Sequence, residues 1–542
     1  MSVAASLAAP GRATLGRAEA LLDDLNPQQR AAVVHDGGPL LVVAGAGSGK
    51  TRVLTRRIAY LLAARGVSPG EVLAITFTNK AAGEMKERVE ALVGGRARAM
   101  WVSTFHSACV RILRREIKRL GFNTNFTIYD AGDAQRLMTL VARSLDLDPK
   151  RYPPRALMAQ ISNLKNELVD WETARSTATD GQSRELAEVY ATYQRRLQEA
   201  NALDFDDLIF TTVVLLQAFP DVAEHYRRRF RHVLVDEYQD TNHAQYVLIR
   251  ELVGTDLEVQ QADRQSSADG AIGRSELCVV GDADQSIYAF RGANIRNILE
   301  FESDYPDASV VLLEQNYRST QTILSAANAV ISRNSGRKPK RLWTDAGDGD
   351  RIVGYVADNE HDEAAYVASE VDRLSDEHGI RPADIAVFYR TNAQSRVFED
   401  VFLRVGLPYK VVGGVRFYER KEVRDALAYL RVLANPADTV SLRRIINVPK
   451  RGIGDRAEAL MSAFGDRERI GFAAVLDRVA EVPAMATRSL KSVQEFARLL
   501  ADLREVVDSG AEPADVVEAV LEKTGYLEEL AAEGTIESEG RA

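Results

Sequence analysis

A short apolar run that ends in a glycine-rich turn restricts the fold of this chain more than any other feature. The run "PLLVVAG" (39–45) leads into "AGAGSGKT", Ala44 to Thr51, and the amphipathic "KTRVLTRRIAYLLAA" follows. A buried strand, a small-residue turn and a helix in this order surround a phosphate group with backbone N–H groups and a helix N-terminus. The usual leading glycine is Ala44 here. The order predicts a nucleotide-binding loop in which Lys50 reaches the outer phosphates and the Thr51 hydroxyl binds Mg²⁺.

A pair of acids closes a second strand-like run, "RHVLVDE" (231–237), within "VLVDEYQD". Asp236 would hold Mg²⁺ directly or through water, and Glu237 would orient and deprotonate the attacking water. Two acids at a strand end are equally well explained as solvated groups when they stand alone. Beside a phosphate loop they indicate nucleoside triphosphate hydrolysis, although they do not indicate what the energy is used for.

Strand-like and helical segments alternate in two blocks. "EVLAITF" (71–77) and "AMWVST" (99–104) continue the first block, helical spacing dominates from about 107 to 230, and strands resume at 231–237 and 276–282. A second block starts near "ASVVLLEQNYRS" (308–319), includes "RIVGYVA" and "DIAVFYRTNAQSR", and turns helical from about 412. Such alternation predicts parallel sheets covered on both faces, each block followed by a helical insertion.

Charge and cysteine content exclude some classes of protein. The chain has 69 Lys+Arg and 78 Asp+Glu, a net charge of −9, which argues against nonspecific coating of DNA but permits a local basic channel. The chain has two cysteines, Cys109 and Cys278, far apart in sequence, so neither a disulfide framework nor a cysteine-based zinc site is expected, and a reducing compartment is. No apolar run approaches the ~18 residues of a membrane span, and residues 1–24 are predicted to be a flexible tail. We expect a cytoplasmic protein with no membrane partner.

Further stretches join these two motifs in a fixed order. They are "LNPQQRAAV", "AITFTNKAAGEM", "STFHS", "DFDDLI", "VDEYQDTN", "GDADQSIYAFRGA", "LEQNYRS", "AVFYRTNAQSR" and "VGGVRFYERKEVRD". Together with the phosphate loop they resemble the superfamily 1 DNA helicases of the UvrD/PcrA/Rep type, from about residue 25 to the end. The resemblance implies an α/β fold with two RecA-like parallel-sheet P-loop domains, each carrying a helical insertion subdomain. The implied domains are residues 25–106 with 205–305, their insertion 107–204, a second RecA-like domain 306–410 and its insertion 411–542.

The family's activity sets the functional expectation. The resemblance implies ATP-driven 3′-to-5′ movement along single-stranded DNA with duplex unwinding, in DNA repair or replication restart. ATP and Mg²⁺ are the implied cofactors. Single-stranded DNA, single/double-strand junctions and repair proteins are the implied partners of a monomer or weak dimer.

Residue roles at the nucleotide follow from the matched positions. Gln29 would read the adenine edge, because an amide both donates and accepts, and Tyr317 would stack on the ring. Arg318 would reach the γ-phosphate from the opposite domain, while Gln285 would sense that phosphate. The implied nucleotide contacts are Gln29, Ala46, Gly47, Ser48, Gly49, Lys50, Thr51, Arg52 and Tyr317, and the implied catalytic residues are Lys50, Asp236, Glu237, Gln285, Arg291 and Arg318.

The turn "VVGDADQSIYAFRGA" (279–293) also carries two aromatic residues, Tyr288 and Phe290, shortly after Gln285. A base stacked on an aromatic ring is worth ~1–3 kcal/mol with any sequence, so one segment could report phosphate loss to the DNA. Family members often carry Trp at the Phe290 position, which predicts weaker stacking here. Core packing is the alternative for Phe77, His106, Tyr288 and Phe290. The implied DNA contacts are Phe77, Thr78, Asn79, Thr104, His106, Ser107, Tyr288, Phe290, Arg390, Asn392, Arg396 and Arg416.

The sequence departs from the family at its end, "GTIESEGRA". The family continues with the rest of the second α/β domain, including a "GLEF"-type motif and a second γ-phosphate arginine, and neither is found. We expect a truncated chain that binds ATP and DNA but turns over poorly. Two further hypotheses remain: the motor part of a nuclease-helicase, and a nucleotide-gated clamp on single strands that displaces or recruits proteins without unwinding.

Overall fold

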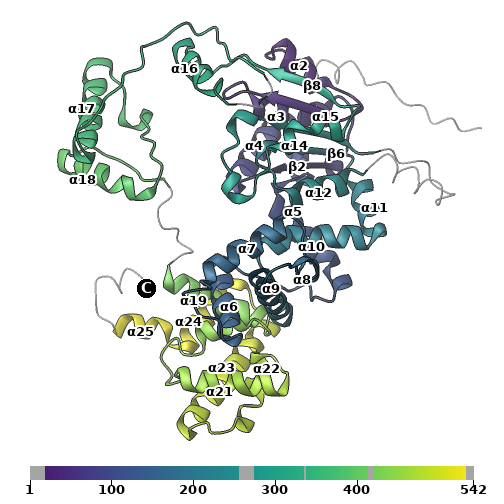
Figure 1. Cartoon of the computed structure of the whole chain (residues 1–542), viewed down its shortest axis with the longest axis vertical. Helices are drawn as coiled ribbons and strands as arrows, with labels where there is room; N and C mark the ends of the chain where they lie inside the picture. Colours follow the sequence, from purple (N-terminus) through teal and green to yellow (C-terminus); the bar gives the residue numbers. More distant parts are fainter. Residues whose placement is uncertain (1–18, 255–273, 335–336, 338, 413–419, 533–542) are drawn as a thin grey trace, which may run out of the picture. The chain divides into compact units, whose positions relative to one another are not determined.

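The computed structural model describes residues 19–254, 274–334, 337, 339–412 and 420–532 (Figure 1). The chain divides into two compact units, residues 1–348 together with 428–542, and residues 349–427. No helix in the described part of the chain combines the length and apolar character that crossing a membrane requires.

A six-stranded parallel sheet forms the centre of the larger unit, in the order β3-β2-β6-β7-β1-β8. The strands are β1 (Leu40–Ala44), β2 (Val72–Thr76), β3 (Trp101–Thr104), β6 (His232–Val235), β7 (Glu276–Gly281) and β8 (Ser309–Leu313). Leu41 lies opposite Val279 on one side and Val310 on the other. Because all the strands are parallel, their carboxyl ends meet at one edge of the sheet.

Helices cover both faces of this sheet. Successive strand residues point to opposite faces, so Leu41 and Val43 belong to one apolar core and Leu40 and Val42 to another. The first core is covered by α5 (Phe105–Glu116), α10 (Phe205–Ala218), α11 (Pro220–Arg229) and α12 (His243–Val253), with the short α14 (Arg296–Leu299) and α15 (Phe301–Asp304) at its rim. The second is covered by α2 (Pro27–Val34), α3 (Lys50–Ala63) and α4 (Asn79–Val93). The predicted sheet covered on both faces is thereby confirmed.

A separate helical core follows α5. It consists of α6 (Ala131–Ser144), α7 (Pro154–Asn166), α8 (Trp171–Thr177) and α9 (Gly181–Glu199). The paired two-residue strands β4 (Thr127–Ile128) and β5 (Ala202–Leu203) join it to the rest. Ile112 and Leu113 of α5 pack in the core of the sheet, and the predicted start of the helical insertion at residue 107 stays a prediction.

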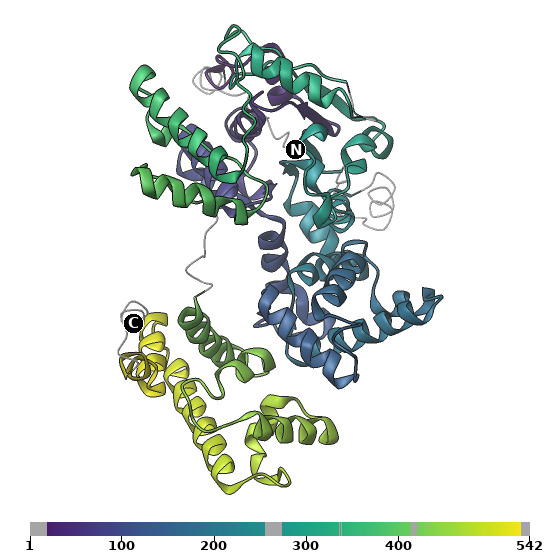
Figure 2. The same cartoon turned by 60° about the vertical axis from the view of Figure 1, so that its left-hand side comes forward.

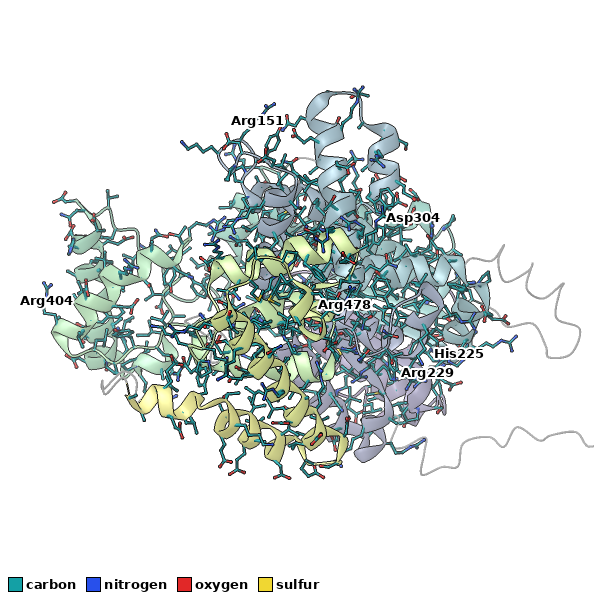
Figure 3. All side chains as sticks on the ribbon, turned by 90° about the horizontal axis from the view of Figure 1, so that it is seen from below. Arg151, His225, Arg229, Asp304, Arg404 and Arg478 are labelled. Carbon is teal, nitrogen blue, oxygen red and sulfur yellow. The ribbon has the colours of Figure 1, made fainter. Side chains whose placement is uncertain are left out.

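The C-terminal helices form another bundle, green to yellow in Figure 2. They are α19 (Lys421–Ala434), α20 (Thr439–Ile445), α21 (Asp455–Glu468), α22 (Phe472–Asp477), α23 (Thr487–Asp508), α24 (Pro513–Thr524) and α25 (Tyr526–Ala532). Within the larger unit this bundle is hydrogen-bonded to the first insertion. Asn435 Nδ2 donates to the carbonyl oxygens of Ala200 (2.9 Å) and Asn201 (3.1 Å). Tyr129 also donates to buried Asp438, at 2.7 Å. Away from such contacts, charged side chains such as Arg151 and Asp304 point outward (Figure 3).

One expectation about the second α/β block is not met. β8 pairs with β1 in the first sheet, and α16 (Gln321–Ile331) follows β8 in the same compact unit, while the predicted domain boundary at 305 stays a prediction. The smaller unit contains α17 (Glu360–His378) and α18 (Ser395–Val405). Its predicted strands "RIVGYVA" and "DIAVFYR" form no strand in the described residues, and Val356 and Phe388 are 95% and 93% exposed. A strand needs a hydrogen-bonding neighbour, and the described residues of this unit supply none.

A buried ion cluster ties α7 to α10 inside the first insertion. The Lys165 ammonium contacts Asp204 Oδ2 at 2.7 Å and Asp207 Oδ1 at 2.8 Å. One cation therefore faces two carboxyl groups. Burial, followed by the charge of Asp204, raises the pKa of Asp207 to about 7.

This cluster predicts a pH dependence of stability. Between about pH 4, the ordinary range for aspartate, and about pH 7, the folded protein holds a proton on Asp207 that the unfolded chain releases. Raising the pH across this window should lower the free energy of unfolding. Asp207→Asn has no carboxyl group to titrate and should give a flatter profile than the wild type in urea unfolding at pH 5 and pH 7. The exposed Asp508→Asn is the control, and parallel profiles for wild type and Asp207→Asn would contradict the assignment.

Candidate nucleotide and DNA site

The motif residues converge on the carboxyl edge of the sheet. The phosphate loop follows β1, Asp236 and Glu237 follow β6, the "GDADQ" turn follows β7, and "EQNYRS" follows β8. This edge is where parallel α/β sheets bind ligands. Segments that are far apart in the sequence therefore form one site.

The phosphate loop has the backbone that its small residues predict. Gly47 and Gly49 have φ angles of +67° and +92°, in the left-handed region that side chains disfavour. Ser48 Oγ donates to the Gly45 carbonyl at 2.7 Å, and Asn316, from beyond β8, donates to the Ala46 carbonyl at 2.5 Å. The loop is thus held from two strands while α3 begins directly with Lys50 and Thr51.

Lys50 is paired with the acid that would activate water. Its ammonium lies 2.7 Å from Glu237 Oε2, and Gln239 Nε2 donates to the same oxygen at 2.8 Å. Glu237 has a φ of +49°, a strained conformation for a non-glycine residue that is common at functional sites. The contact brings the predicted phosphate-binding lysine and the predicted general base together.

Negative charge exceeds positive charge beside Lys50. Burial and then the charge of Glu237 raise the pKa of Asp236 to about 6. The same two causes raise the pKa of Asp240 to about 6. Such an acidic site suits a divalent cation, and Thr51 and Asp236 are the residues that would hold Mg²⁺. Among the described residues no group of three or more His, Cys, Asp or Glu is placed to hold a metal alone, so phosphate and water oxygens would complete its shell, as they commonly do for Mg²⁺.

The predicted adenine contacts lie next to this loop. Gln29 is buried, its Nε2 donates to the Ser48 carbonyl at 2.9 Å, and its Oε1 accepts from the Asn26 amide at 3.3 Å. The Tyr317 hydroxyl accepts from Asn26 Nδ2 at 2.9 Å, and the side chain is 53% exposed. Arg52 forms an ion pair with Asp24. The adenine roles of Gln29 and Tyr317 stay predictions.

Arg318 follows β8 of the first sheet and lies in the same compact unit as the phosphate loop. The pairing of β8 with β1 carries "EQNYRS" to the same sheet edge. The prediction that Arg318 reaches the γ-phosphate from an opposite domain stays a prediction. The Arg318 backbone amide donates to Asn316 Oδ1 at 2.8 Å, and its side chain is exposed.

The turn after β7 places Gln285 and the aromatic pair in order. Gln285 Nε2 donates to Asp282 Oδ2 at 2.6 Å. The rings of Tyr288 and Phe290 lie 5.9 Å apart with a 34° tilt, and the side chains are 38% and 73% exposed. Core packing is therefore wrong for both rings. Arg291 ends the short helix Ala289–Arg291, and its side chain lies outside the described part.

The residues after β2 include the cap of the next helix and an exposed side chain. Thr78 caps α4 by accepting from the Ala81 amide at 3.1 Å, and Asn79 is exposed. Phe77 is half-buried, with its ring edge-on to Phe105 at 5.6 Å. Its predicted DNA role stays a prediction, because packing in the core already accounts for part of this ring.

The "STFHS" segment caps the next helix. Thr104 is buried, accepts from the Ser107 amide at 3.2 Å and donates to the Ser107 hydroxyl at 2.9 Å. Burial lowers the pKa of His106, whose ring lies edge-on to Phe205 at 5.5 Å. His106 would therefore offer a DNA phosphate a hydrogen bond rather than a positive charge at neutral pH.

The remaining DNA candidates belong to the smaller unit. Arg390, Asn392 and Arg396 are exposed around the start of α18, where the Arg390 amide donates to Gln394 Oε1 at 2.9 Å. Arg416 lies outside the described residues.

Several residues that shape the site were missed by sequence reasoning. Asn316, Gln239 and Asp282 lie inside the recognised stretches, but their contacts depend on which strands are neighbours. Lys340, described below, lies in "RKPKRLW", a basic stretch typical of a solvated surface. No local signal distinguishes it from Arg341 beside it.

Two sequence families match the chain. The UvrD/REP helicase N-terminal domain matches residues 25–306, and the UvrD-like helicase C-terminal domain matches residues 311–506. The chain belongs to the UvrD/REP helicase family. The predicted resemblance and the α/β helicase fold class are thereby confirmed.

Relatives within the UvrD/REP family include "ATP-dependent DNA helicase UvrD1" of Mycobacterium tuberculosis, 63% identical over 521 residues, which cover 95% of this chain and 66% of that protein. The protein of the same name from Mycobacterium leprae is 61% identical over 517 residues, 94% of this chain and 65% of the relative. "ATP-dependent DNA helicase PcrA" of Bacillus subtilis is 48% identical over 523 residues, 96% of this chain and 68% of the relative. The chain thus spans about two thirds of the length of these relatives.

Proposed function

We propose that this chain belongs to an ATP-dependent DNA helicase that moves 3′-to-5′ along single-stranded DNA, in DNA repair or replication restart. The observation that carries the proposal is the convergence of the phosphate loop, Glu237 and Gln285 at one sheet edge, with Lys50 at 2.7 Å from Glu237. Arrival of the triphosphate would draw Lys50 to the phosphates and free Glu237 to accept a proton from the attacking water.

The exposed aromatic pair supports single-stranded DNA as the partner. Tyr288 and Phe290 follow Gln285 within one turn, so a change at the γ-phosphate would be transmitted over a few residues to rings that can stack on bases. A nucleotide-gated clamp would use the same parts without unwinding. ATP hydrolysis by the complete protein, with and without single-stranded DNA, tests the motor, and strand displacement from 3′-tailed against 5′-tailed duplexes tests its direction. Stimulated hydrolysis without displacement from either duplex would favour the clamp.

Removing either ring should weaken DNA binding. Tyr288→Ala and Phe290→Ala should each raise the Kd for single-stranded DNA by about 5- to 150-fold, which corresponds to the ~1–3 kcal/mol of one base stack. Fluorescence anisotropy at one fixed salt concentration measures this, because phosphate contacts make affinity depend on salt. Leu527→Ala, which shortens an exposed apolar side chain on α25, is the control. Unchanged affinity in both ring variants would remove the aromatic pair from the DNA path.

A further inference from the structure

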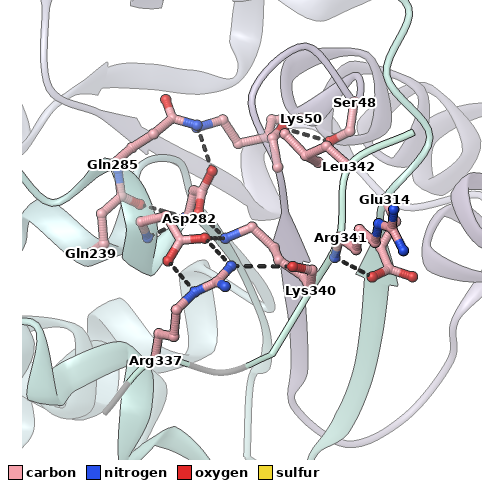
Figure 4. A network of polar contacts seen from close by, with 12 residues as sticks. Ser48, Lys50, Gln239, Asp282, Gln285, Glu314, Arg337, Lys340, Arg341 and Leu342 are labelled. Carbon is pink, nitrogen blue, oxygen red and sulfur yellow. Dashed lines mark hydrogen bonds and ion pairs between the residues drawn. The ribbon is translucent and has the colours of Figure 1, made fainter. Parts of the chain in front are cut away.

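A buried lysine outside the recognised motifs lies behind the site. The Lys340 side chain is 3% exposed and forms ion pairs with Asp282 and Asp284, the two acids of the turn after β7 (Figure 4). Arg337 donates two hydrogen bonds to Asp284, from Nε to Oδ1 at 3.0 Å and from Nη2 to Oδ2 at 2.7 Å. Two cations from the segment after α16 therefore hold two carboxylates of the turn that carries Gln285.

Asp282 connects to the predicted catalytic residues by hydrogen bonds from its carboxylate and its backbone amide. Asp282 Oδ2 accepts from Gln285 Nε2 at 2.6 Å. The Asp282 amide donates to Gln239 Oε1 at 2.8 Å, and Gln239 Nε2 donates to Glu237 Oε2 at 2.8 Å. Asp282, which is 2% exposed, is thus bonded to both Gln285 and, through Gln239, Glu237.

The Asp282 carboxylate determines which way the Gln285 amide faces. It accepts from the NH₂ end of Gln285 and leaves the carbonyl end of that amide for a water or phosphate-bound group. A charge buried this deeply is costly unless an opposite charge or several donors compensate it, and Lys340 is the cation paired with this carboxylate.

We propose that Lys340 is a positioning residue for ATP hydrolysis: by holding the buried Asp282 carboxylate in place, it fixes the orientation of the Gln285 amide that donates to this carboxylate. This inference rests on the proposed ATPase function, and Lys340 itself touches neither nucleotide nor water. Arg337 keeps Asp284 paired when Lys340 is replaced, so the effect is directed at Asp282.

The test is DNA-stimulated ATP hydrolysis by the complete protein. Lys340→Met should lower kcat by about 10- to 100-fold, the usual effect of losing a residue that orients a functional group, with the KM for ATP within about threefold of wild type. Lys340→Arg, which keeps the charge, should recover most of the rate. Arg341→Met, which removes the exposed neighbouring cation, is the matched control and should behave as wild type. A Lys340→Met rate within twofold of wild type overturns the inference.

A double-mutant cycle separates positioning from folding. If Lys340 acts through Gln285, Lys340→Met should lower kcat by less than threefold when Gln285 is already replaced by alanine. If the losses in kcat of the two single variants instead multiply in the double variant, the inference is overturned. The double variant Asp282→Asn/Lys340→Met removes both charges, so its melting temperature should be near that of the wild type. Its ATP hydrolysis should still be at least tenfold slower than that of the wild type. Recovery to within twofold of the wild-type rate would show that Lys340 only stabilises the fold, and would also overturn the inference. Absence of hydrolysis by the wild type would instead reject the proposed function itself.

Discussion

ATP turnover should fall about 10²- to 10⁴-fold when Glu237 is replaced by glutamine, the usual contribution of a positioned general base. Glutamine has nearly the same shape and can still accept from Lys50, which lies 2.7 Å from the acid in this structure. It cannot accept a proton from water at neutral pH. Removing a negative charge beside the phosphates should leave ATP binding unchanged or tighter.

Single-turnover hydrolysis and binding of a fluorescent ATP analogue separate these two effects for Glu237→Gln. Glu224→Gln, which changes a half-buried acid on α11 that pairs with Arg228, is the control and should retain the wild-type rate. A loss smaller than about tenfold, or a loss explained by weaker ATP binding alone, would contradict the assignment of Glu237 as the base.

Arg318→Ala is expected to lower kcat by about 10³- to 10⁵-fold, the range for an arginine that stabilises transition-state charge in phosphoryl transfer. The Arg318 backbone is held beside the phosphate loop, since the neighbouring Tyr317 amide donates to the Gly47 carbonyl at 3.0 Å. Its exposed guanidinium would meet the γ-phosphate as charge develops there.

Comparison with Arg318→Lys tests that role. Lysine keeps the charge but lacks the two-pronged geometry of arginine, so an intermediate rate is expected. Arg333→Ala, an exposed arginine just after α16, serves as the control. If Arg318→Ala raised KM and left kcat unchanged, Arg318 would bind ATP in the ground state only.

The parts of the site that depend only on residues close together in the sequence were predictable from the sequence. The strand, turn and helix around Lys50 follow from an apolar run, small residues and an amphipathic repeat, all within a few residues of one another. The same holds for the acids that close β6 and for the aromatic pair after Gln285. Burial of Tyr288 and Phe290 was open from sequence alone, because an aromatic residue fits both a core and an exposed stacking surface.

Strand pairing and burial were decided only by the tertiary structure. The run before "EQNYRS" is apolar enough for any sheet, and its pairing with β1 moved Arg318 into the same unit as the phosphate loop. The segments at 351–357 and 384–390 have strand-like sequences, but strand formation needs a partner, and the described residues of their unit offer none.

The sequence alone determined which residues are candidates for the proposed chemistry, because a phosphate loop, its acids and their order along the chain are local patterns that tolerate little variation. The tertiary structure decided which groups act together. Lys340 and Arg341 are adjacent cations in one basic stretch, yet one is buried between two carboxylates and the other is exposed. That difference arises from contacts between residues more than 50 positions apart, and no local pattern encodes them.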